Sequence, residues 1–165
     1  MIRQKKIMYE EDLHEIFFRY PYLIIDEPTS IINTIHEYKL DSSSIPDIYI
    51  ETKNKKYYCE VKLGKLKEKD LYQAIRYFNT INGNIEKNKI KDDKEFSVIL
   101  IGMNISNQLE NKAEKKNIHV KIIGRNILES IKICKICRKA YDFKELKCIV
   151  CKSEEVLEII TLKYP

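Results

Sequence analysis

The sequence is poor in glycine and proline, with four of each in 165 residues, and it contains no long apolar run. A membrane-spanning helix needs roughly 18 apolar residues, and a secretory signal needs a basic stretch, an apolar run and a small-residue cleavage site. Neither pattern is present. We therefore expect a soluble, cytoplasmic protein with no membrane partner. Abundant Lys, Glu and Ile fit a thermophilic source, although an AT-rich genome produces the same bias.

The sequence has five cysteines, and their distribution is uneven. Four of the five cysteines lie between positions 134 and 151, whereas Cys59 lies far upstream in an apolar strand pattern. This distribution indicates a local site and excludes a chain-wide disulfide framework. In a reducing compartment, clustered cysteines hold a metal more often than they bridge one another. Cys59 is interpreted as core packing.

The net charge is +5, and a third of the residues are charged. Residues 132–165 carry eight basic and five acidic residues, so this C-terminal segment is more basic per residue than the rest. A basic segment makes nucleic acid a plausible partner, but charge alone does not establish one.

Apolar periodicity predicts an α/β fold with a mixed sheet flanked by helices. The expected helices have apolar residues at helical spacing, and the expected strands are short apolar or alternating runs. The order is helix 9–20, strand 30–38, a hairpin of 47–51 and 57–62, helix 67–82 with Gly83 beyond its end, strand 96–101, a helix from Ser106 to 116, and strand 118–122.

The hairpin carries the residues that suggest chemistry. Alternation places Glu60 and Lys62 on one face of its second strand, and Asp47 opposite the apolar Ile48 and Ile50 in its first. If both apolar faces pack inward, Asp47 and Glu60 meet at one polar rim. Two such carboxylates repel each other unless a cation lies between them, and their hard oxygens suit Mg²⁺.

Mg²⁺ would neutralise charge on phosphate oxygens and lower the pKa of a bound water, and Lys62 could position that water. This is the chemistry of phosphodiester hydrolysis. The alternative is structural, because Glu-x-Lys is common on exposed strand faces, where such a pair contributes only about 0.2–1 kcal/mol.

Three motifs in order resemble the PD-(D/E)xK nuclease superfamily. Pro46-Asp47, twelve intervening residues and Glu60-Val61-Lys62 resemble its signature, and Gln73-Ala-Ile-Arg-Tyr77 matches the Gln-x-x-x-Tyr motif of RecB-like members. The resemblance implies a restriction-endonuclease-like fold, which we assign to residues 1–131 as the nuclease domain.

The sequence is more closely similar to the catalytic domain of the archaeal endonuclease NucS and its relatives. Glu10-Glu-Asp-Leu13 and Pro21-Tyr-Leu-Ile24 resemble the opening helix of that domain, and the likeness covers residues 9–125. Ser44-Ile45-Pro46 stands where these relatives usually have a glycine, and the N-terminal DNA-binding domain of NucS has no counterpart. The substrate preference of NucS therefore does not carry over.

The resemblance implies a role for each site residue. Asp47 and Glu60 bind Mg²⁺ or Mn²⁺ with the Val61 carbonyl as a further ligand, Lys62 acts at the attacking water, Gln73 orients the site or touches phosphate, and Glu10 is the helix-borne acid. Helical geometry also places Glu10 beside the apolar stripe. An acid at a helix N-terminus is alternatively explained by the macrodipole.

Other residues near these motifs have structural interpretations. Gln73 and Tyr77 could be an exposed amide and a half-buried ring one helical turn apart, and we favour a functional role for Gln73 and a structural role for Tyr77. His14 is interpreted as a helix-surface group and is left out of the site.

The clustered cysteines form two C-x2-C pairs separated by ten residues, Cys134-Lys-Ile-Cys137 and Cys148-Ile-Val-Cys151. Four thiolates from two tight turns can surround Zn²⁺ tetrahedrally, and the segment is too short to bury a core without such help. Residues 132–165 therefore resemble a zinc ribbon with a structural zinc. An iron centre of rubredoxin type and two disulfides are the alternatives.

The ribbon could bind either DNA or a protein partner. Aromatic residues expected on its surface, Tyr141 and Phe143, permit both roles, and residues 156–164 should pair with the ribbon as a strand or dock it onto the nuclease. The basic residues expected to contact DNA are Lys135, Arg138, Lys139, Lys144 and Lys147.

The sequence thus predicts a metal-dependent DNA endonuclease of DNA repair, recombination or replication. Dimers are frequent among proteins of this resemblance, so a homodimer is a further expectation. The alternative function is a catalytically inactive nucleic-acid-binding or adaptor module that uses the zinc ribbon.

Overall fold

The computed structural model describes residues 2–6, 9–25, 30–87, 89, 94–123 and 130–163. The chain divides into two compact units, which are Ile31–Ile122 and the combination of Met1–Ser30 with Ile123–Pro165. Residues 1–30, assigned from sequence to the nuclease domain, thus group with the cysteine segment. The division into 1–131 and 132–165 stays a prediction.

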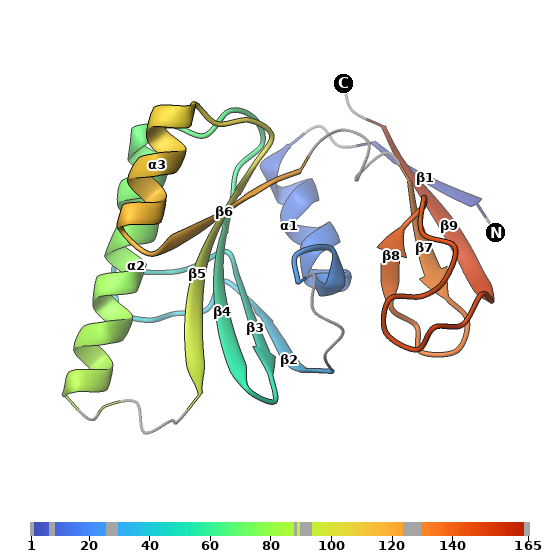
Figure 1. Ribbon diagram of the computed structural model, residues 1–165, viewed down its shortest axis with the longest axis horizontal. Coiled ribbons are helices and arrows are strands. Elements are labelled where there is room, and N and C mark those ends of the chain that lie inside the picture. Colours follow the sequence, from blue (N-terminus) through green and yellow to red (C-terminus); the bar gives the residue numbers. More distant parts are fainter. Residues whose placement is uncertain are drawn as a thin grey trace. The chain divides into compact units, whose positions relative to one another are not determined.

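The unit Ile31–Ile122 is a mixed five-stranded sheet with strand order β2-β3-β4-β5-β6. Strands β2, β3 and β4 pair antiparallel, whereas β4, β5 and β6 pair parallel. Helices α2 and α3 lie along one face of this sheet (Figure 1). The α/β prediction is confirmed at this level. The elements are β2 (Ile31–His36), β3 (Ile48–Thr52), β4 (Lys55–Val61), α2 (Glu68–Glu86), β5 (Glu95–Gly102), α3 (Asn107–Lys115) and β6 (Ile118–Ile122).

The two helices serve as the crossovers that parallel strands require. Ser106 caps α3, because its Oγ accepts a hydrogen bond from the Leu109 N–H at 3.3 Å. The predicted start of this helix is therefore confirmed. At the start of α2, Asp70 Oδ2 accepts from the Lys67 N–H at 2.8 Å and satisfies one of the donors that a helix N-terminus leaves open.

A hydrophobic core fills the space between this sheet and its two helices. Tyr49 of β3 and Tyr58 of β4 are buried here, and the Tyr49 ring stacks on Tyr38 with centroids 4.4 Å apart. The strand face that carries Glu60 is therefore covered along most of its length by α2, whose inward side chains are Leu71, Ala74, Tyr77 and Ile81.

Helix α2 is longer than predicted. It continues through Gly83 to Glu86, so the placement of Gly83 beyond the helix end was wrong. Gly83 does not take the left-handed conformation that ends many helices. Burial of Ile81, which is 1% exposed, anchors the last turns and outweighs the poor helix propensity of glycine.

Gly102, at the end of β5, lies against the loop that follows β4. A Cβ atom at Gly102 would lie 2.5 Å from Leu66 Cγ, and Leu66 is buried and hydrogen-bonded through its N–H to the Asn104 carbonyl. Replacing Gly102 with alanine should therefore lower the free energy of unfolding by about 1–3 kcal/mol in chemical denaturation. Gly83→Ala is the matched control, because a Cβ at Gly83 meets no atom within 4 Å. Equal stability of Gly102→Ala and the parent would contradict the close approach.

The other unit contains a four-stranded sheet with strand order β1-β9-β7-β8. Strand β9 pairs antiparallel with β7, which confirms that the predicted C-terminal strand pairs with the cysteine segment. Strand β1, which was not predicted, pairs parallel with β9, and this pairing explains why the N-terminal residues group with the cysteine segment. The elements are β1 (Ile2–Lys6), α1 (Glu10–Arg19), the 3₁₀ helix η1 (Pro21–Leu23), β7 (Ser130–Cys134), β8 (Ala140–Asp142) and β9 (Val156–Lys163).

None of the helices in the described part of the chain combines the length and apolar character that crossing a bilayer requires.

Candidate active site and four-cysteine centre

The hairpin register brings Asp47 next to Glu60. Ile48 of β3 pairs with Cys59 of β4, so Asp47, just before β3, continues the register beside Glu60. The Val61 N–H donates to Asp47 Oδ2 at 2.7 Å and fixes the Asp47 carboxylate against β4. The convergence expected from strand alternation is thus present.

Glu60 is a buried carboxylate, with 1% of its surface exposed. Its Oε1 lies 2.7 Å from Lys62 Nζ, and its Oε2 accepts a hydrogen bond from the Tyr77 hydroxyl at 2.8 Å. Burial and the negative charge of Asp47 raise the pKa of Glu60, while Lys62 and Tyr77 oppose that shift. The Glu60 and Lys62 pair is therefore not the weak pair of an exposed strand face.

Helix α2 supports Glu60 through Tyr77 and Gln73. Gln73 Nε2 donates to the Tyr77 hydroxyl at 2.7 Å, and that hydroxyl also lies 3.1 Å from the Ile45 carbonyl oxygen. Tyr77 is 1% exposed, so the expectation of a half-buried ring was wrong. Sequence reasoning gave this residue a structural role only. Its position on the buried stripe of α2, one turn after Gln73, is the signal that could have placed it beside Glu60.

The candidate site is partly exposed to solvent. Asp47, Lys62 and Gln73 are half-buried, whereas Glu60 and Tyr77 are fully buried. The Lys62 side chain is 22% exposed and does not enter the hydrophobic interior. A ligand that approaches from solvent would therefore meet one carboxylate, one ammonium and one amide before it meets Glu60.

The donor set of this site fits a hard divalent cation. Two carboxylates lie together in a largely buried setting, where a positive ion would relieve their repulsion. In the part of the chain that the structure describes, the cysteine cluster is the one place where three or more His, Cys, Asp or Glu side chains lie close enough together to hold a metal ion. A cation at Asp47 and Glu60 would thus need further oxygen ligands. The Val61 carbonyl is the further ligand that the resemblance implies. Glu10, which the resemblance implies as the helix-borne acid of the site, lies in the first turn of α1, in the other unit.

The raised pKa of Glu60 predicts a pH-dependent stability in buffer without added Mg²⁺. Protonated Glu60 favours the folded state below the ordinary glutamate value of 4.5, and this contribution is lost as pH rises through the raised folded-state pKa. From about pH 4 to pH 8, Glu60→Gln should gain stability relative to the parent. The gain should be about 1.4 kcal/mol for each unit by which the pKa is raised. Denaturation curves of both proteins at several pH values test this. A difference in the free energy of unfolding that does not change with pH would count against a raised pKa of Glu60.

The four predicted zinc ligands come together in the second unit. The Sγ atoms of Cys134, Cys137, Cys148 and Cys151 all lie within 4.8 Å of one another. Two of the separations, Cys134 to Cys151 and Cys137 to Cys148, are 3.5 Å. Zinc bonded tetrahedrally to sulfur at about 2.3 Å would separate the sulfurs by about 3.8 Å. The cluster could therefore hold a structural zinc. All four cysteines are free of disulfide bonds.

The two cysteine turns have the same backbone geometry. The Cys134 N–H donates to the Lys139 carbonyl at 2.8 Å, and the Cys148 N–H donates to the Ser153 carbonyl at the same distance. Arg138 and Lys152, each directly after the second cysteine of its turn, both have a φ of 62°. Two equivalent turns that face one another are a geometry suited to closing a four-thiolate site.

The surroundings of the Cys134 sulfur favour a thiolate, whereas burial and the neighbouring thiols raise the pKa of Cys137 to about 12. Burial opposes ionisation of Cys134, but backbone N–H groups of Cys137 and Ile136 and neighbouring thiols lower its pKa to about 7.

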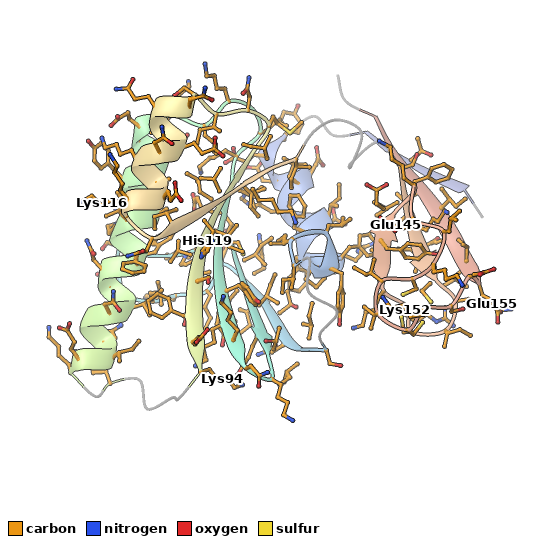
Figure 2. All side chains as sticks on the ribbon, viewed as in Figure 1. Lys94, Lys116, His119, Glu145, Lys152 and Glu155 are labelled. Atoms are coloured by element: carbon orange, nitrogen blue, oxygen red, sulfur yellow. The ribbon has the colours of Figure 1, made fainter. Side chains whose placement is uncertain are left out.

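Tyr141 packs against this cluster and is 1% exposed, so the expectation of a surface aromatic was wrong for Tyr141. Phe143 is 45% exposed, as expected. Side chains of this unit, including Glu145, Lys152 and Glu155, are shown in Figure 2.

Comparisons of the chain with protein-family models, curated proteins and solved structures found no match.

Proposed function

We propose that this chain is a metal-dependent DNA endonuclease of the PD-(D/E)xK type, with a restriction-endonuclease-like fold and a C-terminal zinc ribbon. The observation that carries the proposal is the buried Glu60 carboxylate, held beside Asp47 and bound by both Lys62 and Tyr77. Burying one carboxylate beside another costs free energy unless a cation offsets the negative charge, so such a pair calls for a function. Buried carboxylates whose pKa is raised by a neighbouring acid are found more often at catalytic sites than elsewhere.

Asp47 and Glu60 would hold Mg²⁺ or Mn²⁺, with the Val61 carbonyl as the proposed third protein ligand. The cation would supply neutralisation of phosphate charge and a lower pKa for water. Lys62 would hold the attacking water and donate to the phosphate oxygens as negative charge develops on them. Lys62 is suited to this role because its ammonium lies 2.7 Å from Glu60 and is also partly open to solvent.

Gln73 and Tyr77 would act as positioning residues. The Tyr77 hydroxyl binds Glu60 Oε2, and Gln73 Nε2 binds the same hydroxyl, so the orientation of Glu60 depends on helix α2. Partners of this kind orient metal-binding side chains and typically contribute about 10–100-fold to metal affinity or activity. The ribbon would keep its fold through zinc and guide DNA or a protein partner, as in DNA repair, recombination or replication.

Cleavage of labelled DNA tests this proposal. Zinc-loaded protein is incubated with single-stranded, duplex, flap and junction DNA in Mg²⁺, Mn²⁺ or Ca²⁺, with unsupplemented buffer as the control. We expect cleavage of at least one DNA in Mg²⁺ or Mn²⁺ and none without them. DNA binding without cleavage of any substrate would instead support the inactive binding module.

A further inference from the structure

A groove of about 550 Å³ lies along helix α2, within the unit Ile31–Ile122. This volume lies in the range of pockets that bind ligands. Its lining is mixed, with two cations, several amide and hydroxyl groups and one aromatic ring. The residues most relevant to binding are Tyr72, Arg76, Asn79, Thr80, Asn84 and Lys87.

The groove is bounded by the same two segments that support the candidate active site. Asp41 and Thr80 line the groove, and Thr80 Oγ1 lies 3.4 Å from Ser44 Oγ. One turn back along α2, the Tyr77 hydroxyl contacts the Ile45 carbonyl and Glu60. The boundary between α2 and residues 41–47 therefore runs from the groove to the site.

The charges of the groove suit a phosphate backbone. Arg76 and Lys87 line it, and their separation of eleven positions in the sequence corresponds to about 16 Å along α2. Among the described residues that line the groove, the one acid is Asp41, which accepts hydrogen bonds from the Ser43 N–H at 2.7 Å and from the Ser43 hydroxyl at 3.1 Å. Asn79 and Asn84 offer both donors and acceptors to sugars or bases.

Gly83 provides an independent indication that the groove is kept open. Glycine destabilises a helix interior relative to alanine, so a glycine there calls for a reason. Packing gives none, because a Cβ at Gly83 would meet no atom within 4 Å. Gly83 instead lines the groove, where any larger side chain would project into the open space.

We propose that this groove binds a strand of the DNA substrate next to the cleaved phosphate, with Arg76 and Lys87 contacting its phosphates. The proposal rests on the proposed nuclease function, since it assigns the path of that enzyme's substrate. It concerns binding, however, and binding can be measured without cleavage.

The experiment measures DNA affinity of the full, zinc-loaded chain in Ca²⁺, over a range of salt concentrations. Arg76→Ala with Lys87→Ala should weaken binding about tenfold and reduce the salt slope by nearly two, the value for two lost phosphate contacts. The charge control is Lys69→Ala with Lys115→Ala, which removes two exposed lysines of α2 and α3 that do not line the groove. Its affinity should fall less than threefold.

Two substitutions of Gly83 separate the groove from the fold. Gly83→Phe should fill the groove and weaken binding about tenfold, while Gly83→Ala should bind as the parent does. Both should keep or raise the melting temperature, because either residue is a better helix former than glycine.

Parent-like binding by Gly83→Phe, or equal losses in the groove and charge-control variants, would overturn the inference. If Gly83→Phe does not fold, the Arg76 and Lys87 double variant decides. If the parent cleaves DNA and the groove variants bind and cleave as the parent does, the groove proposal is wrong and the nuclease proposal stands. If DNA binding depends on the groove but no DNA is cleaved, the nuclease proposal is wrong and the groove still binds DNA.

Discussion

Replacing Lys62 or Asp47 with alanine is expected to lower the rate of DNA cleavage by about a thousandfold or more, with DNA affinity within a few-fold of the parent. Loss of Asp47 would remove one of the two carboxylates proposed to hold the cation. Loss of Lys62 would remove the ammonium that lies 2.7 Å from Glu60 and is partly exposed to solvent. Single-turnover cleavage and Ca²⁺-supported DNA binding measure the two quantities separately.

Lys65→Ala is the matched control for Lys62→Ala, because Lys65 is an exposed lysine three residues further along. This control should cleave at nearly the parental rate. Loss of Lys62 leaves Glu60 buried without its ammonium, so circular dichroism should establish that the variant is folded. Full activity of both site variants would refute the assigned site.

Replacing Cys148 with serine is expected to abolish tight zinc binding and to unfold the cysteine unit. Cys148 is fully buried in a small cluster with Cys134 and Tyr141, so the packing around the four sulfurs includes few other apolar side chains. Structural zinc contributes about 10–16 kcal/mol of binding free energy in zinc-finger peptides, which is folding free energy for so small a segment. Amide resonances of residues 130–163 should collapse, while those of residues 31–122 should stay dispersed.

Cys59→Ala is the control for the zinc experiment, because Cys59 is buried in β4 and is not part of the four-cysteine cluster. Its zinc content should remain one ion per chain. If Cys148→Ser kept one zinc ion and unchanged resonances for residues 130–163, the metal-dependent ribbon would be wrong. Bound iron in the purified parent would favour the rubredoxin-type alternative.

The hairpin that carries the site was predictable because strand alternation has a fixed period of two residues. Once the two runs were aligned, the period determined that Glu60 and Lys62 share a face and that Asp47 lies at the adjacent end. Alternation could not show that this face is buried. Tyr49 and Tyr58 lie on it, and their burial depends on packing against α2, which is a tertiary contact.

Two features of α2 were not predicted, and the physical reasons are related. Gly83 suggested a helix end, but propensity is a weak local preference that buried Ile81 overrides. Tyr77 was given a structural role because its spacing fits the apolar stripe equally well. Its hydroxyl reaches Glu60 only because β4 lies under that part of the helix. Such contacts between distant segments are not encoded in a local pattern.

The cysteine unit shows the same division between local and long-range information. The C-x2-C spacing was enough to predict the four-sulfur cluster, because two short turns determine its geometry. The parallel pairing of β1 with β9 joins the two ends of the chain, and no periodicity within either segment indicates the partner. Tyr141 was expected at the surface because an isolated aromatic in a polar segment gives no sign of what packs on it.

Binding of Mn²⁺ to the zinc-loaded chain tests most directly whether Asp47 and Glu60 form a cation site. Titration followed by electron paramagnetic resonance should detect one Mn²⁺ per parent chain, and Asp47→Asn or Glu60→Gln should weaken that binding at least about tenfold. Equal Mn²⁺ affinity in the parent and both variants, or no Mn²⁺ binding by the parent, would contradict the proposed metal-dependent nuclease.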